Sequence, residues 1–456
     1  MRYLKESIRG RRLLFGCLMM VMGLSVRAQQ SFTLKQTIDY AETHSLLLGT
    51  SRVELDKNVF LEKNLVNNLI PTLTFNSNLG GLWGRSIDPT TNNFTTNQTI
   101  FQTLGLQSSI TLLSSSTFNL SKQIAKSNTE IARYRLENQL MALKANIILS
   151  YLNMVGARAK AAMTERSIEF YAKQVRVTDT LIAYQRRTLP DKIRFQQQIS
   201  SDSVTLLRQQ SAIQEAMIQL QGLADHQADV TYDNTDINDT TANGLFDYIQ
   251  QVRLTELESA FLKDHPGVKE HYASINLNKT QLRIAKRAWV PAVSISLGLG
   301  SNYSDNYFLL GRPINYFEQV IRNNISQSVF INLSLPILNH NANKRSIYQA
   351  EAGIRQQVLE SESNVQQLRT SIRSAYNDAY YAFRSYQQSN ISLRKIEALV
   401  DLNTRLFKTN RLSVIDFIQS ARELNSELLN NQDLRTTALF KIILLKFYAS
   451  KNLNFL

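Results

Sequence analysis

The chain has 456 residues and a formal net charge of +14, with 51 lysines and arginines against 37 aspartates and glutamates. Its single cysteine, Cys17, lies near the N-terminus, which excludes internal disulfide bonds and thiol chemistry from the rest of the chain. The basic residues are spread along helix-like segments and form no block, a pattern that favours solvated helix faces over nucleic-acid binding.

Residues 1–28 have the features of a secretory signal: a basic region, the apolar core Leu13–Leu24 and a small-residue cleavage site ending at Ala28. Cleavage there removes a net charge of +5 and leaves +9. Lipidation of Cys17 is the alternative, which the bulky Phe15 and the continuing apolar core disfavour. Beyond the signal, no apolar run reaches the roughly 20 residues of a membrane helix, so strands must form any membrane-spanning part.

The remaining chain contains one pattern twice. Residues 60–80 and 280–300 each begin as a helix, reach a proline (Pro71 or Pro291) and continue with alternating apolar and polar residues. A repeat of this kind describes the architecture of the whole chain and takes precedence over local patterns.

The duplication continues downstream, where residues 110–153 match 335–378 without a gap. Between the copies lies an acidic, turn-rich stretch that we expect to be irregular. The expected organisation is a first repeat at 29–222, a linker at 223–245 and a second repeat at 246–456.

Four segments alternate with period two, and each is about as long as a membrane strand of roughly 9–11 residues. One face of each is apolar and the other is small or polar, which fits lipid outside and water inside. A soluble sandwich shows the same alternation and stays open as an alternative. The expected strand pairs are 72–82 with 104–113, and 292–302 with 328–336.

The rest of the chain is predicted to be helical. The regions 119–186 and 341–409 contain no proline, and each would make a rod of roughly 100 Å at about 1.5 Å per residue. Heptad-like spacing from Ile354 to Ala382 indicates a coiled-coil seam. We expect the shorter helices to stack end to end in pairs beside the rods: 32–69 with 412–449, and 191–222 with 254–290.

Aromatic residues lie at both ends of the expected strands. Trp83, Tyr303 and Tyr307 fall where strands would leave the bilayer on one side, and Trp289 precedes the strand at the other end. Aromatic belts at the two lipid–water interfaces show this arrangement. Ordinary loop aromatics are the alternative.

Four strands with unpaired edges cannot lie in lipid, because every backbone group there needs a hydrogen-bond partner. The chain must therefore oligomerise, and three copies would supply twelve strands. The expected fold is an α+β membrane protein with an internal duplication, in which a trimer forms a twelve-stranded barrel continued by a long coiled-coil α-helical barrel.

Short motifs resemble those of the TolC family of outer-membrane efflux and export channels. IPTLTF (70–75) and VPAVSIS (290–296) match its helix-to-strand junctions, LSLPILN (333–339) matches its strand-to-helix junction, and 189–191 and 412–416 match its tip turns. The resemblance implies a homotrimer in the outer membrane with a periplasmic helical tunnel. Its partners would be outer-membrane lipid, a periplasmic adaptor and an inner-membrane pump of the RND or ABC type.

The function that this resemblance implies is a passive exit duct, of a tripartite efflux system or a type I secretion system, for small molecules or exported polypeptides. We expect no enzyme and no cofactor, because the histidines show no metal-ligand spacing and no catalytic motif is present. A periplasmic adaptor-like coiled-coil scaffold is the alternative.

The resemblance also suggests a gate at the tunnel's narrow end. Asp416 matches a family aspartate that faces the tunnel, while Gln419 occupies the place of a second one. We expect three Asp416 carboxylates around one axis, with Arg187 and Arg411 pairing between chains in the closed state. Aligning the tip motifs gives Ile193 as the counterpart of Asp416, so only one tip would be acidic. The alternative role of Asp416 is to complement the helix dipole.

The tips themselves, Thr188-Leu189-Pro190 and Leu412-Ser413, present leucines on small-residue turns. By resemblance, these residues form the surface that docks onto the adaptor. The alternative is a plain turn whose leucine covers the end of a neighbouring helix.

Overall fold

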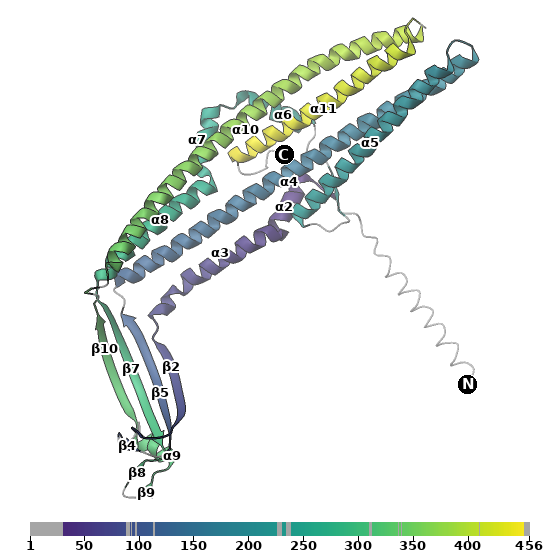
Figure 1. The fold of residues 1–456 in the computed structure, drawn as a ribbon. Helices are drawn as coiled ribbons and strands as arrows, with labels where there is room; N and C mark the ends of the chain where they lie inside the picture. Colours follow the sequence, from purple (N-terminus) through teal and green to yellow (C-terminus); the bar gives the residue numbers. More distant parts are fainter. Residues whose placement is uncertain are drawn as a thin grey trace, which may run out of the picture. The chain divides into compact units, whose positions relative to one another are not determined.

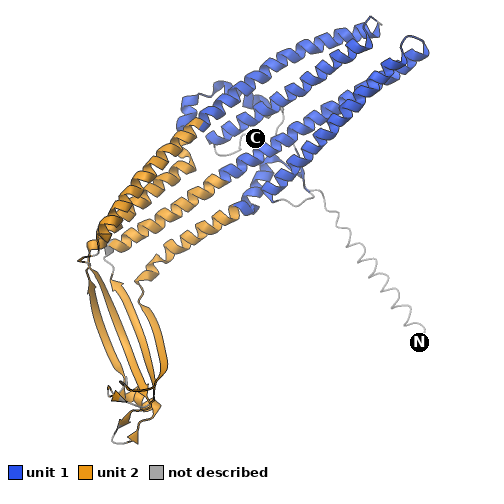
Figure 2. Ribbon diagram, viewed as in Figure 1, with its two compact units in different colours: residues 1–47, 140–261, 371–456 blue, residues 48–139, 262–370 orange. Residues whose placement is uncertain are grey.

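The computed structural model describes residues 31–87, 92, 94–95, 98–112, 115–225, 230–233, 239–309, 312–335, 337–338, 340–409 and 411–450. The expected signal, with Cys17, lies outside these residues. The chain forms two compact units (Figure 2), and each takes segments from both repeats. We call them the helical unit (1–47, 140–261, 371–456) and the sheet unit (48–139, 262–370).

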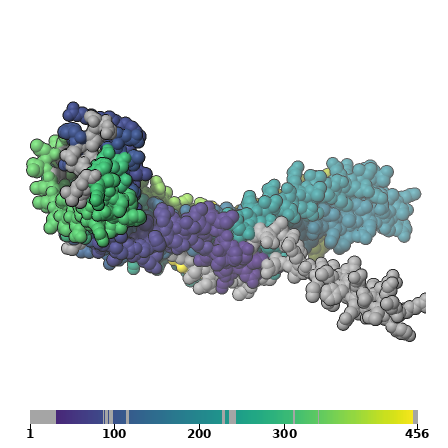
Figure 3. Space-filling view, turned by 90° about the horizontal axis from the view of Figure 1, so that it is seen from below, coloured from purple at the N-terminus to yellow at the C-terminus, as the bar shows by residue number. Residues whose placement is uncertain are grey.

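The sheet unit contains one four-stranded antiparallel sheet in the order β10-β7-β5-β2 (Figure 1). Strands from the two repeats therefore pair at its centre, and Figure 3 shows the blue and green segments of the two repeats side by side at the loop end. The ladders extend β5 and β10 upstream of the expected 104 and 328. The strands are β2 (Thr72–Leu82), β5 (Thr99–Leu112), β7 (Ala292–Ser304) and β10 (Ser326–Ser334).

The register gives the sheet two chemically different faces. Leu73 pairs with Ser108, which pairs with Leu297, which pairs with Val329, so these side chains share one face. The other face carries mainly threonine, asparagine, serine and glycine. On the two outer strands, the large apolar side chains of the first face are 65–72% exposed: Leu73, Phe75, Leu79, Val329, Ile331 and Leu333.

The loops between paired strands contain structure that the sequence did not predict. The short pairs β3–β4 and β8–β9 form there, together with the helical turns α9 (Tyr316–Glu318) and η3 (Gln319–Asn323). Gln319 is buried and bonds both backbone groups of Ser304, at 2.9 Å and 3.0 Å. The pairs are β3 (Ser86–Ile87) with β4 (Phe94–Thr95) and β8 (Phe308–Leu309) with β9 (Arg312–Pro313).

Both shorter helices that precede a strand pair are interrupted. The helix expected at 32–69 is broken at Ser45, and the one expected at 254–290 is broken at His265, whose Nδ1 accepts the Gly267 N–H at 3.1 Å. Pro266 occupies the first helical position, where its missing N–H costs nothing. The segments are α2 (Leu34–His44), α3 (Leu46–Asn64), η1 (Leu65–Leu69), α7 (Leu254–Asp264), α8 (Pro266–Lys286) and η2 (Arg287–Trp289).

Two helical hairpins form the end of the helical unit. The first joins α4 (Ser115–Ala183) to α5 (Leu189–Ala224), and the second joins α10 (Ala342–Lys408) to α11 (Val414–Ser450). Among the described residues, one stretch, Thr117–Ala183 in α4, is apolar enough by composition to span a membrane, contrary to expectation. Its fully buried side chains mark α4 as a core helix of this unit: Leu143, Ile147, Ile148, Tyr151 and Leu152.

The expected irregular linker is partly ordered. The helix α6 (Asp239–Gln251) begins inside it, because Leu245, Phe246 and Ile249 are buried. Residues Thr231–Tyr232 (β6) pair in parallel with Ser31–Phe32 (β1), and Arg158 of α4 donates to the Tyr232 carbonyl. The prediction of an irregular segment was wrong from Asp239 onward, since apolar anchors outweighed its polar composition.

Candidate functional site

The two hairpin tips are built on the same local device. At the first tip, the backbone N–H and the hydroxyl of Thr188 donate to the Asp191 carboxylate at 3.1 Å and 2.9 Å. At the second, the Ser413 hydroxyl donates to Asp416 at 2.6 Å and accepts the Asp416 N–H at 3.1 Å. Each aspartate therefore stabilises the start of its helix, both through the cap and through its charge.

This geometry corrects the expected counterpart of Asp416. Asp191 stands three residues after its cap residue, as Asp416 does after Ser413, so the counterpart is Asp191 and not Ile193. The turns agree, since the Arg186 N–H donates to Leu181 and the Arg411 N–H to Leu406. Both tips are thus acidic, and the prediction of one acidic tip was wrong because it aligned motif letters instead of cap positions.

Arg187 connects the two tips within one chain. Its guanidinium lies 4.5 Å from the centre of the Phe407 ring, and Nη2 donates to the Leu412 carbonyl at 3.5 Å. The side chain is half-buried, and its Nε is buried without a hydrogen-bond partner among the described residues. A cation over an aromatic face is attracted by the ring quadrupole, most strongly where water is excluded.

The other expected gate residues lie on the surface of the second tip. Arg411, Asp416 and Gln419 are exposed, and the Gln419 amide donates to Glu423 at 3.3 Å on the same helix. The structure thus brings Arg187 to Phe407 and Leu412, and Asp416 to Ser413.

The two tip leucines differ. Leu189 is 61% exposed and stands beside exposed Thr188 and Pro190. Leu412 is half-buried and packs against apolar side chains of its own chain, as the plain-turn alternative describes, while Ser413 is exposed. Only the first tip therefore presents an apolar residue outward.

An aromatic cluster under the tips joins the hairpins, and sequence reasoning missed it. Tyr171 of α4, Phe195 of α5, Phe407 of α10 and Phe417 of α11 are all buried there. Phe407 stacks on Phe417 with ring centres 4.2 Å apart, and Phe195 lies 6.4 Å from each. The usable signal was one aromatic residue near the tip on each of four helices.

A buried polar network lies beside this cluster. Asp202 is 5% exposed and accepts hydrogen bonds from Gln198 and Ser167, both at 2.7 Å. Arg422 of α11 donates to Gln198 of α5 and so extends the network to the other hairpin. Burial, with a smaller contribution from the Asp202 charge, raises the pKa of the Tyr171 hydroxyl.

The expected interface aromatics lie at opposite ends of the sheet. Trp83 follows β2 at the loop end, with its ring over Gly81, where a Cβ atom would approach within 2.8 Å. Tyr303 ends β7 on the same side, its ring 5.0 Å from that of Tyr316, and Tyr307 follows in the loop. Trp289 lies in η2, before β7, at the helix end.

Within the described part of the chain, no cluster of three or more histidine, cysteine or acidic residues could hold a metal ion. The described histidines have structural contacts instead. His44 stacks on Tyr40, and the His265 ring caps α8.

Comparison with known proteins agrees with this architecture. Residues 257–441 match the family described as outer membrane efflux protein. This chain belongs to that TolC-like family. An outer membrane efflux protein is a channel protein of the outer membrane and not an enzyme, which sets aside the adaptor-like alternative.

Solved structures share the fold of this outer membrane efflux protein. VceC from Vibrio cholerae is 14% identical, with 91% of this chain and 95% of that chain covered and a TM-score of 0.73. The open-state MtrE channel from Neisseria gonorrhoeae is 15% identical, with 91% and 88% covered and a TM-score of 0.71. CusC is 15% identical, with 91% of both chains covered and a TM-score of 0.75. No curated protein sequence matches the chain.

Proposed function

We propose that this protein is the trimeric exit duct of a tripartite efflux system or a type I secretion system. It would passively conduct small molecules or exported polypeptides from a periplasmic adaptor and an inner-membrane pump to the exterior. The pump would supply the energy, since the duct has no catalytic centre.

The observation that carries the proposal is the open, two-faced sheet. Its outer strands β2 and β10 each have a strand neighbour on one side among the described residues, and its apolar face is exposed. In lipid, the unpaired backbone groups of those edges would each cost several kcal/mol, on the order of the cost of an unsatisfied buried polar group. Three copies closing edge to edge into twelve strands would remove both problems at once.

We further propose that the tips form the gate and the docking surface. In a trimer, three copies of Asp416 would surround the narrow end, with Arg411 and Gln419 nearby, and Arg187 would hold each pair of hairpins together. Exposed Thr188, Leu189, Pro190 and Ser413 would meet the adaptor, with Leu412 supporting the second tip from within. Adaptor binding opens such a gate only if the adaptor binds the open state more tightly.

Mass measurement and conductance test the proposal together. The mature protein, purified from membranes in detergent, should have three times the mass of one chain and should form steady pores in planar bilayers. A monomer that gives no conductance would overturn the proposed duct.

A further inference from the structure

Two helices of the helical unit carry exposed stripes with coiled-coil spacing. On α5, residues from Ile193 to Ile218 recur at alternating steps of four and three, and every position of the stripe is exposed. On α10, the residues from Tyr381 to Leu402 do the same. Their large apolar members are 49–66% exposed: Ile193, Val204, Leu207, Ile218, Tyr381, Ile391 and Leu402.

The other two hairpin helices bury their long side chains between the hairpins, as Tyr171 of α4 and Phe417 of α11 do. In Figure 1, α10 and α5 form the outer sides of the paired hairpins, with α11 and α4 between them. Heptad spacing is the pattern by which one helix packs against another. Each stripe therefore lacks a helix partner among the described residues of this chain.

The two stripes can be compared for height from contacts within the chain. Arg422 of α11 bonds Gln198 of α5, and Lys441 of α11 pairs with Asp378 of α10 at 2.6 Å. Because every helix rises by about 1.5 Å per residue, counting between these contacts puts Gln198 level with Glu397.

Counting from this level in either direction matches the stripes position by position, since α5 and α10 run in opposite directions. Ile193 is level with Leu402, and Val204 is level with Ile391. The cations of the α10 stripe, Lys395 and Arg384, are level with Ser200 and Ser211 in turn. Long charged side chains thus face small neutral ones, whereas α10 against another α10 would bring like charges together.

We propose that α5 of one copy packs against α10 of the next copy as an antiparallel coiled-coil seam. A closed ring of three identical chains needs two different surfaces on opposite sides of each chain, and these two stripes supply such a pair. The inference rests on the proposed trimer and adds the surface and the register through which neighbouring helical units meet.

Cysteine pairs test the seam, because the mature chain has no cysteine once Cys17 is removed with the signal. The double variant Val204→Cys/Ile391→Cys should, after mild oxidation of the purified trimer, place more than half of the chains in covalent dimers and trimers on a non-reducing gel. The single variants should give none, since each supplies one side of a heterologous contact.

Two further pairs control the experiment. Val204→Cys/Tyr381→Cys separates the cysteines by ten residues, roughly 15 Å along the helices, and should not cross-link. Asn390→Cys/Asn431→Cys replaces a hydrogen-bonded pair within one chain and should lose its free thiols without a change in mass, which shows that oxidation worked.

The outcomes separate the seam from the trimer. A trimeric mass without cross-links from Val204→Cys/Ile391→Cys would overturn the seam and leave the proposed duct standing. A monomeric mass would overturn both. If a different protein covers the stripe, Val204→Cys alone stays open to a maleimide in the purified trimer, which also overturns the seam.

Discussion

At the scale of single residues, Asp416 performs a structural task that is visible within one chain. Its carboxylate accepts the Ser413 hydroxyl proton, and Asp191 holds the other helix start in the same way. A gating role needs its negative charge, whereas the cap needs only an oxygen that accepts a hydrogen bond. The two roles can therefore be separated by substitution.

We expect Asp416→Asn to retain the cap and to lower the preference of the pore for cations over anions in bilayer recordings. Ser413→Ala should leave ion selectivity unchanged and lower stability by about 0.5–2 kcal/mol, the usual cost of losing a helix cap. Unchanged selectivity in Asp416→Asn would leave Asp416 with the cap alone.

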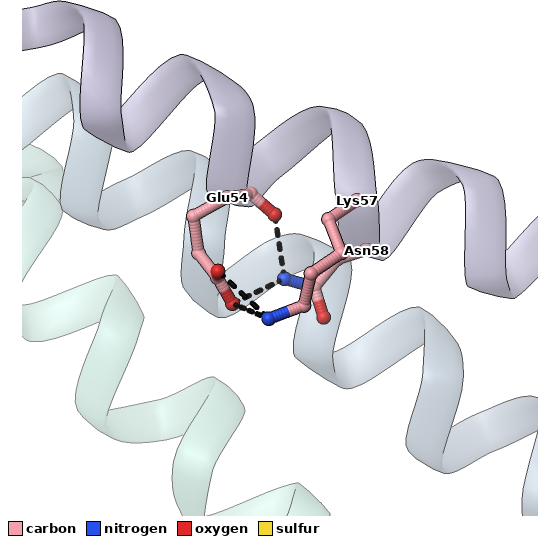
Figure 4. Close-up of polar contacts among 3 residues, drawn as sticks. All are labelled: Glu54, Lys57 and Asn58. Atoms are coloured by element: carbon pink, nitrogen blue, oxygen red, sulfur yellow. Dashed lines mark hydrogen bonds and ion pairs between the residues drawn. The ribbon is translucent and has the colours of Figure 1, made fainter.

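Glu54 on α3 is a second residue with a measurable charge effect. Lys57 donates to its carboxylate at 2.9 Å and Asn58 donates to it at 3.1 Å, as Figure 4 shows. These two hydrogen bonds favour the ionised form and lower the pKa of Glu54 below its ordinary value of 4.5. The stabilisation is fully present above that value and is lost as the pH falls through the lower folded-state pKa.

Glu54→Gln should therefore melt at a slightly lower temperature than the parent protein at pH 7, because the site is exposed to solvent. The difference should shrink as the pH falls below about 4, when the parent protein also loses the charge. Asp56→Asn, on the same helix, is the control in parallel thermal melts. A difference that persists at low pH would contradict the charge explanation.

At the scale of elements, the hairpins are held together by packing. The four aromatic side chains of the cluster come one from each helix, so each hairpin's position depends on the other. Arg187 adds a cation–aromatic contact above the cluster. The cluster should set the stability of both tips.

We expect Phe195→Ala to cost about 3–5 kcal/mol, the usual range for a buried aromatic residue replaced by alanine. The loss should appear as faster amide hydrogen exchange in both tips, including the α10–α11 tip that does not contain residue 195. Gln196→Ala, the exposed neighbour, should leave exchange unchanged. Faster exchange in the first tip alone would mean that the hairpins are not coupled.

At the scale of the whole molecule, the two faces of the sheet decide how the protein meets lipid. Phe75 and Asn76 are neighbours on β2 that point to opposite faces, and both are exposed in one chain. If the apolar face meets the bilayer, a charge there is costly, while a charge on the polar face remains hydrated.

Phe75→Arg should reduce folded protein in the outer membrane, with a cost of about 2–4 kcal/mol per chain near the bilayer centre. Asn76→Arg should fold at the parent level and change single-channel conductance. Heat-modifiability on gels and membrane fractionation measure folding, and bilayer recordings measure conductance. Equal folding of the two variants would contradict the lipid-facing assignment.

Local patterns determined much of this protein. Prolines at Pro71 and Pro291 end helices because proline lacks a donor and clashes with the preceding turn, and period-two alternation defines β2, which spans the expected 72–82. The duplication likewise predicted the paired strands and the two long helices. These features depend on neighbours in sequence, so they can be read without a fold.

Tertiary structure decided the rest, because it joins residues more than 200 positions apart. Arg187 meets Phe407, Phe195 meets Phe417, and β5 pairs with β7, and none of these contacts has a local signal. The equivalence of Asp191 and Asp416 likewise became visible from cap geometry. Local spacing selects helices and strands, but burial and side-chain geometry decide which of their residues meet.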